Sequence, residues 1–228
     1  MANIFFDIGQ KNNNTRNDRE KLLFIEGTDD AYFLDRILAN VNADPDYVGL
    51  VTVGGTGQFL SNIKSFSKSS QFTTGKNKGL VIVRDVDEDF NGVSNEMAQL
   101  FFSLFGVVVR HGEIVVLDGR AYGFFLMPGQ DRAGDLERLC LDTVEGKVLA
   151  LKSYEFLNSV EPVPSDQVFK RLAQVYLAGH VGDLCRGAGR GFNRGQFDDT
   201  HAILNPLKEF LSDFIRAGLT VPSVVEPA

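Results

Sequence analysis

Three short apolar runs, each followed by a turn and an amphipathic helical pattern, constrain the fold of this chain most strongly. The runs are KLLFIEG (21–27), YVGLVTVGG (47–55) and GLVIVRDVD (79–87). After the first run, apolar residues recur at helical spacing, at Phe33, Leu34, Ile37 and Leu38. Apolar runs without strict alternation are typical of strands that are covered on both faces. Repeated strand–helix units therefore predict an α/β fold with a mostly parallel sheet flanked by helices.

Two more apolar runs follow, EIVVLDG (113–119) and AYGFFLMPG (121–129), and either fits a further strand. Pro128-Gly129 is a strong stop signal at the end of the second run. Beyond it, apolar residues return at helical spacing around Leu136, Val168 and Leu204. We expect an α/β core over residues 21–130 and a C-terminal helical extension over 131–220 that packs on it. The polar or proline-bearing ends, 1–20 and 221–228, are predicted to be a loosely held arm and tail.

Composition limits the classes of function. Of the 228 residues, 43% are hydrophobic, which is enough for a sizeable core. No run approaches the ~20 apolar residues of a membrane span, and the start of the chain lacks the features of a signal peptide. We therefore expect a cytoplasmic protein that has no membrane partner. The net charge of −7 argues against a protein that coats nucleic acid through its overall field, but not against an enzyme that recruits metal ions to an acidic pocket.

Acidic residues end two of the predicted strands. Glu26 closes the first run, and Asp85 and Asp87 close the third. In extended backbone, residues two apart point to the same side, and Glu26 joins them if the first and third strands are neighbours. Such carboxylates repel one another unless a cation binds between them, and hard oxygen ligands suit magnesium or manganese. The alternative is that these acids cap helix N-termini, where the helix dipole favours negative charge.

The segments FIEGTDD (24–30) and VIVRDVDED (81–89) together resemble the Toprim signature, a strand-ending Glu-Gly and a strand-ending Asp-x-Asp. Toprim domains occur in topoisomerases, primases, recombination proteins and the nucleases of the overcoming-lysogenization-defect family. The resemblance implies a Toprim-like sheet. It also implies that Glu26, Asp85 and Asp87 bind a divalent metal.

Further details resemble stand-alone Toprim-like proteins related to that nuclease family, over roughly residues 20–216. They are an acid four places after the Glu (Asp30), a Phe-x-Met-Pro-Gly stretch (125–129) followed by Gly-x-Leu-Glu (134–137), and Lys170 before Tyr-Leu-Ala (176–178). By this resemblance Asp30 and Glu137 complete one or two metal sites, and Lys170 stabilises transition-state charge. The alternatives are an ordinary acid in the first turn of a helix for Glu137 and a solvated surface lysine for Lys170.

A glycine-rich basic stretch, RGAGRGFNRG, spans residues 186–195. As a flexible loop, it offers Arg186, Arg190 and Arg194 to a nucleic-acid backbone and Phe192 to a base. The alternative is a mobile loop that only connects two helices.

These features predict a nuclease or phosphodiester hydrolase that acts on DNA or RNA and uses magnesium or manganese as cofactor. Water is the expected nucleophile, activated by the metal or by Glu26. Two alternatives stay open. One is a module that is inactive alone and works with a separate ATPase, because related nucleases carry an ATPase domain and this chain has no P-loop. The other is a hydrolase of small nucleotides or phosphoesters.

Overall fold

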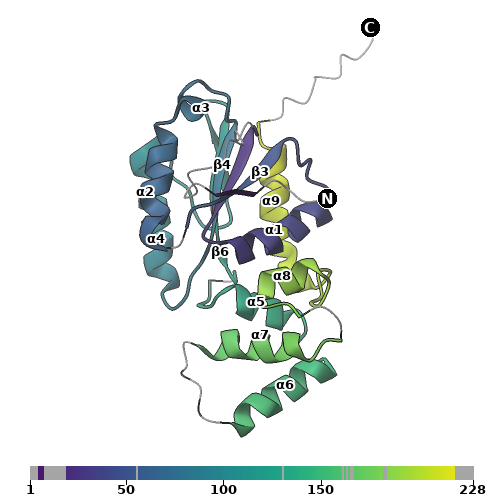
Figure 1. The fold of residues 1–228 in the computed structure, drawn as a ribbon. Helices are drawn as coiled ribbons and strands as arrows, with labels where there is room; N and C mark the ends of the chain where they lie inside the picture. Colours follow the sequence, from purple (N-terminus) through teal and green to yellow (C-terminus); the bar gives the residue numbers. More distant parts are fainter. Residues whose placement is uncertain are drawn as a thin grey trace.

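A six-stranded sheet lies at the centre of the molecule, in the order β1-β3-β2-β4-β6-β5 (Figure 1). The computed structural model describes residues 5–7, 19–54, 56–129, 131–160, 162, 164, 167–181 and 184–218. The strands are β1 (Phe5–Asp7), β2 (Lys21–Ile25), β3 (Val48–Thr52), β4 (Gly79–Asp85), β5 (Ile114–Leu117) and β6 (Arg120–Met127). All neighbouring strands pair in parallel except β5, which runs antiparallel to β6. The predicted α/β fold with a mostly parallel sheet is confirmed.

β5 and β6 form a hairpin, so both of the later apolar runs are strands. Leu117 pairs with Arg120 across the two-residue turn Asp118-Gly119. Both turn residues have positive φ, at 50° and 74°. This is the geometry of a type I′ turn, for which an Asp-Gly pair is favoured. The turn brings β6 back beside β4 in parallel register.

Helices cover both faces of the sheet (Figure 1). One face carries α2 (Thr56–Ser67), α3 (Ser70–Thr73) and α4 (Phe90–Phe105), and the other carries α1 (Thr28–Asn40) and α9 (Asn205–Arg216). Alternate residues of β2 enter the two layers: Leu22 and Phe24 pack on the α2–α4 side, and Leu23 and Ile25 on the α1 side. Burial on both faces explains why the strands read as continuous apolar runs.

The C-terminal helices extend the α1 side of the molecule. They are α5 (Leu136–Asp142), α6 (Val148–Ser159), α7 (Val168–Ala178), α8 (Ala188–Asn193) and, after the 3₁₀ turn Ala202–Leu204, α9. Buried residues of α5, α7, α8 and α9 belong to the same hydrophobic cluster as those of β2, β4 and α1. α6 packs on α7 at the outer end of the molecule (Figure 1). The extension therefore shares its core with the sheet.

The predicted N-terminal arm contributes to the sheet. Phe5–Asp7 form the edge strand β1, which pairs with β3. The rest of the arm up to residue 18, and the tail 221–228, lie outside the described residues. None of the helices in the described part of the chain is long and apolar enough to cross a membrane.

Candidate functional site

Two neighbouring parallel strands, β2 and β4, bring Glu26 and Asp85 to one edge of the sheet. Phe24 of β2 lies opposite Ile82 of β4. Glu26 directly follows β2, and Asp85 is the last residue of β4. The neighbouring strands that the metal-site hypothesis requires are therefore present, and their carboxyl ends meet where parallel sheets usually place their sites.

Asp85 is surrounded by other acids. Its Oδ1 atom is buried and has no hydrogen-bond partner among the described residues. Burial raises the pKa of Asp85 well above its ordinary value, and the charges of Asp30, Asp135, Glu137 and, less strongly, Glu26 raise it further. A buried acceptor without a partner costs about 1–3 kcal/mol. The Oδ1 atom of this carboxylate is therefore left unsatisfied by the described groups of the protein.

Asp30 lies in the first turn of α1 and Glu137 in the first turn of α5, and the charges of both raise the pKa of Asp85. Burial raises the pKa of Asp30 to about 6, although its Oδ2 accepts a hydrogen bond of 2.9 Å from the Gly27 amide. Burial also raises the pKa of Glu137 to about 7; Asp135 adds to this rise and Lys170 opposes it. Asp30 and Glu137, both predicted metal ligands, thus join Glu26, Asp85 and Asp135 in one acidic cluster, although the two residues lie more than a hundred positions apart in the sequence.

An arginine holds Glu26. Arg84 donates from Nε to Glu26 Oε1 at 2.9 Å and from Nη1 to Glu96 Oε2 at 2.9 Å. Burial raises the pKa of Glu26 and outweighs the opposing effect of Arg84; Asp87 raises it further and Lys170 lowers it. Glu26 is therefore a partly buried carboxylate that the guanidinium group of Arg84 already contacts.

Asp87 is oriented differently from the sequence-based expectation. β4 ends at Asp85, and Asp87 has a positive φ of 57°. Its backbone exchanges hydrogen bonds of 2.9 and 2.8 Å with Gly134. The side chain is exposed. The expectation of extended backbone through both aspartates is wrong, because the chain turns at Asp87 to pair with the loop before α5.

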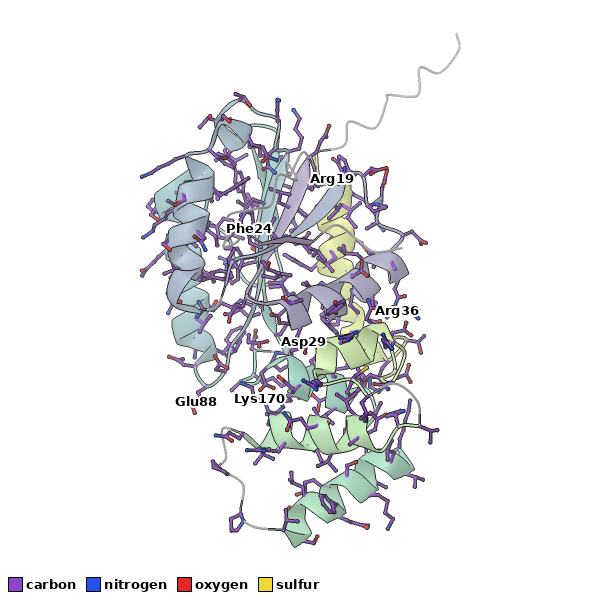
Figure 2. All side chains as sticks on the ribbon, in the orientation of Figure 1. Arg19, Phe24, Asp29, Arg36, Glu88 and Lys170 are labelled. Atoms are coloured by element: carbon purple, nitrogen blue, oxygen red, sulfur yellow. The ribbon has the colours of Figure 1, made fainter. Side chains whose placement is uncertain are left out.

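A cleft of about 650 Å³ opens beside the acidic cluster. Asp87, Glu88 and Asp135 contribute acidic groups to it, and Arg138 and Lys170 contribute basic groups. Figure 2 shows Glu88 and Lys170 at the same end of the molecule. Lys170 lies on α7 and is exposed, but it also acts on the pKa values of Glu26 and Glu137. The tertiary structure thus brings Lys170 to the predicted site.

Carboxylate oxygens are suitable ligands for a divalent cation, but these acids are not arranged around a common point. In the described part of the chain, no three His, Cys, Asp or Glu side chains converge closely enough to hold a metal ion as they stand. Glu26 is turned to Arg84, Asp30 to the Gly27 amide, and Asp87 to solvent. Among the described acids, Asp85 has a buried oxygen, Oδ1, that accepts no hydrogen bond. Cation binding by Glu26, Asp30, Asp85, Asp87 and Glu137 stays a prediction.

Sequence reasoning missed two acids of this region. Asp135 is buried and caps α5, with Oδ1 accepting from the Arg138 amide at 2.9 Å. Asp29 accepts from the amides of Gly189 and Arg190 at 2.9 and 3.0 Å and so caps α8. An aspartate just before a helical pattern is an N-cap signal that identifies Asp135 locally. The partner of Asp29 lies 160 residues away in the sequence and has no local signal.

The prediction of a flexible basic loop over residues 186–195 is wrong. Ala188–Asn193 form α8, and Phe192 is fully buried, with its ring centroid 4.6 Å from that of Phe33. A Cβ atom added at Gly189 would lie 1.9 Å from the carbonyl oxygen of Asp29. The glycines serve close packing of α8 on α1, and Phe192 is not available to stack on a base. Arg186, Arg190 and Arg194 as nucleic-acid contacts stay a prediction.

A protein-family model described as "Protein of unknown function (DUF3226)" matches residues 20–216. The chain belongs to this family. No curated protein matches the DUF3226 chain. Among solved structures it is similar to the C-terminal region of the Xanthomonas campestris pv. campestris OLD protein, with 15% identity, a TM-score of 0.48 and coverage of 86% of this chain and 96% of that one.

A second solved structure, the C-terminal region of the Burkholderia pseudomallei OLD protein, is also similar to the DUF3226 chain. Its identity is 14% and its TM-score 0.45, with coverage of 86% of this chain and 98% of that one. Similarities at this level assign no activity to the DUF3226 chain.

Proposed function

We propose that the protein is a divalent-cation-dependent hydrolase of phosphodiester bonds in DNA or RNA. The observation that carries the proposal is the buried Asp85 carboxylate, whose Oδ1 has no hydrogen-bond partner among the described residues, while four other acids act on it. Crowded carboxylates are stabilised either by protonation or by a cation between them. Hard oxygen donors favour magnesium or manganese.

The residues that would hold the cation are Glu26, Asp30, Asp85, Asp87 and Glu137. When bound, the cation would neutralise and polarise the phosphate group. The protein's own contribution is to hold these acids close together at the ends of β2 and β4 and the start of α5, where the pKa values that burial raises favour protonation until a cation replaces the protons. Glu26 can serve as a ligand only if its ion pair with Arg84 breaks or shifts.

Glu26 and Lys170 act on the reacting groups. A raised pKa suits a carboxylate that accepts the proton of the attacking water, and burial raises the pKa of Glu26. The water oxygen forms a bond to phosphorus as the bond to the leaving oxygen breaks. Lys170 lines the cleft, and its ammonium group stabilises the negative charge that grows on the phosphoryl oxygens.

The first test is calorimetric binding of magnesium and manganese to the wild type and to Asp85→Asn. Glu209→Gln, an exposed acid on α9, is the matched control. We expect binding to the wild type and the control and none to Asp85→Asn. The same proteins are then incubated with labelled single-stranded and duplex DNA, RNA and nucleoside triphosphates. Cleavage of a polymer that requires both metal and Asp85 supports the proposal, whereas hydrolysis of triphosphates alone favours a small-phosphoester hydrolase.

A second candidate is a module that is inactive alone and completed by a separate ATPase. The observation in its favour is that Arg84 pairs with Glu26 and that the described acids do not converge as they stand. A partner that moves Arg84 would release Glu26. Cleavage by the isolated chain at millimolar magnesium would exclude this candidate, and cleavage only after addition of a copurifying ATPase would support it.

A further inference from the structure

The basic wall of the cleft contains an arginine with unused hydrogen-bonding capacity. The guanidinium carbon of Arg138 lies 4.9 Å from the centroid of the Phe169 ring. Its Nε atom is buried without a partner among the described residues. Within the described part of the chain, the side chain makes one hydrogen bond, from Nη1 to the Ala133 carbonyl at 3.4 Å. That distance is longer than an ordinary N–H···O bond.

Other arginines near the site are engaged by carboxylates. Arg84 binds Glu26 and Glu96, and Arg132 donates to Asp142 at 2.6 Å. Arg138 has no such ion pair with any described residue, although Asp135 lies three residues before it. The Asp135 carboxylate is instead used to cap α5. Arg138 therefore presents a positive charge to the cleft that no carboxylate of the described residues neutralises by direct contact.

The loop before α5 holds Arg138 in place. Gly134 has φ of +145°, and a Cβ atom there would lie 2.8 Å from Cδ of Arg138. Gly134 also pairs with the backbone of Asp87. The absence of a side chain at Gly134 lets the stem of Arg138 lie close to the loop, while Phe169 supports the guanidinium group. Such stacking fixes the planar group before a ligand arrives, which lowers the entropy cost of binding.

We propose that Arg138, stacked on Phe169 and next to Lys170, forms a phosphate-binding subsite that holds the backbone of a nucleic-acid strand beside the acidic cluster. This inference rests on the proposed function and deepens it. A guanidinium group matches phosphate oxygens with two parallel hydrogen bonds. In a chain of net charge −7, a local basic wall is needed to attract a polyanion. A cleft of about 650 Å³ has room for nucleotide-sized groups, so a single strand is the expected ligand.

The experiment measures binding of a fluorescent single-stranded DNA of about twelve nucleotides by anisotropy, with calcium replacing magnesium to slow cleavage. Arg138→Gln is expected to weaken binding about tenfold and to lower the slope of log affinity against log salt by about one. Arg138→Lys should keep the salt slope and recover only part of the affinity. Phe169→Leu should weaken binding less than Arg138→Gln, because it removes the support and keeps the charge.

Arg171→Gln is the matched control, since Arg171 neighbours Lys170 on α7 but lines a different cavity. Unchanged magnesium binding by Arg138→Gln shows that the variant is folded at the site. The inference is overturned if the wild type does not bind the strand, or if Arg138→Gln and Arg171→Gln have equal effects. Failure of the proposed function is seen separately, as absence of divalent-cation binding or of cleavage in the wild type while the Arg138 effect on strand binding persists.

Discussion

The strand β2 begins at Lys21 and leads at its other end to the partly buried Glu26, and the two charged groups have different surroundings. At its start, Lys21 is fully buried. The ammonium group donates to three carbonyl oxygens at the end of α9, those of Phe214, Ile215 and Ala217. At the other end, Glu26 leads to the acidic cluster, where Asp85 Oδ1 has no hydrogen-bond partner among the described residues.

The comparison distinguishes the charge of Lys21, which stabilises the fold, from the charges of the acidic cluster, which we propose bind a cation. The Lys21 charge is placed where the carbonyls and dipole of a helix C-terminus stabilise a cation. The Lys21 side chain thereby links the end of α9 to the start of β2. The charge of the acidic cluster is left for a group from outside the protein to neutralise.

Asp85→Asn is expected to abolish activity and stabilise the metal-free protein. Cleavage in saturating magnesium should fall by at least about 10³-fold, because a key oxygen donor is lost. Without metal, the free energy of unfolding should rise by about 1 kcal/mol, because folding no longer requires this carboxyl group either to stay ionised among other acids or to take up a proton. Urea unfolding in a chelator measures this change, with Glu209→Gln as the control. A loss of stability in Asp85→Asn would show that the carboxylate is satisfied in the native protein.

Lys21→Met should show the opposite pattern. The substitution leaves the carbonyls at the end of α9 without their donor, so we expect the free energy of unfolding to fall by about 3 kcal/mol. Magnesium affinity, measured by calorimetry at a temperature where the variant is folded, should stay within about twofold of the wild type. A large loss of metal affinity in the folded variant would mean that the two ends of β2 are coupled.

The stability of the metal-free protein should fall as pH rises from about 4.5 to about 7. Burial raises the pKa of Asp30 to about 6 and of Glu137 to about 7, so in this window the folded state binds more protons than the unfolded state. The stabilisation is complete below the unfolded pKa values and is lost as pH passes the folded ones. We expect a fall on the order of 2 kcal/mol, measured by urea unfolding across this range.

Two comparisons sharpen the pH experiment. Glu137→Gln should flatten the upper part of the profile, because the group that titrates near pH 7 is removed. Millimolar magnesium should reduce the fall in the wild type, because a bound cation replaces the protons. A profile that does not change with magnesium would argue against a cation at this cluster.

Asp29→Ala tests an acid in the same region whose carboxylate already accepts hydrogen bonds from backbone amides. The substitution removes the cap of α8, so we expect a loss of about 1 kcal/mol in the free energy of unfolding. Magnesium affinity should change little, because Asp29 is committed to the amides of Gly189 and Arg190. Loss of magnesium binding in Asp29→Ala would place this carboxylate among the ligands instead.

Much of the architecture followed from local patterns. The apolar runs and helical spacings identified β2, β3, β4 and their following helices, because burial on both faces leaves a signal within each segment. The Glu-Gly and Asp-x-Asp pairs fell at the ends of β2 and β4, and parallel strands bring such ends to one edge. The β5–β6 hairpin was not predicted, although its Asp118-Gly119 pair fits a type I′ turn.

The kind of sheet, the edge at which its acids gather and the residue types available there can all be read from the amino-acid sequence. Which charges are satisfied depends on how distant segments pack together. Lys21 and the Oδ1 atom of Asp85 are both buried on strands of the same sheet, yet α9 supplies acceptors to Lys21 while α1 and α5 bring more acids to Asp85. Likewise, the glycines of 186–195 suggest flexibility until α1 is seen packed against them. The reason is that desolvation and pairing depend on groups distant in sequence, whereas periodicity reports only a segment's own faces.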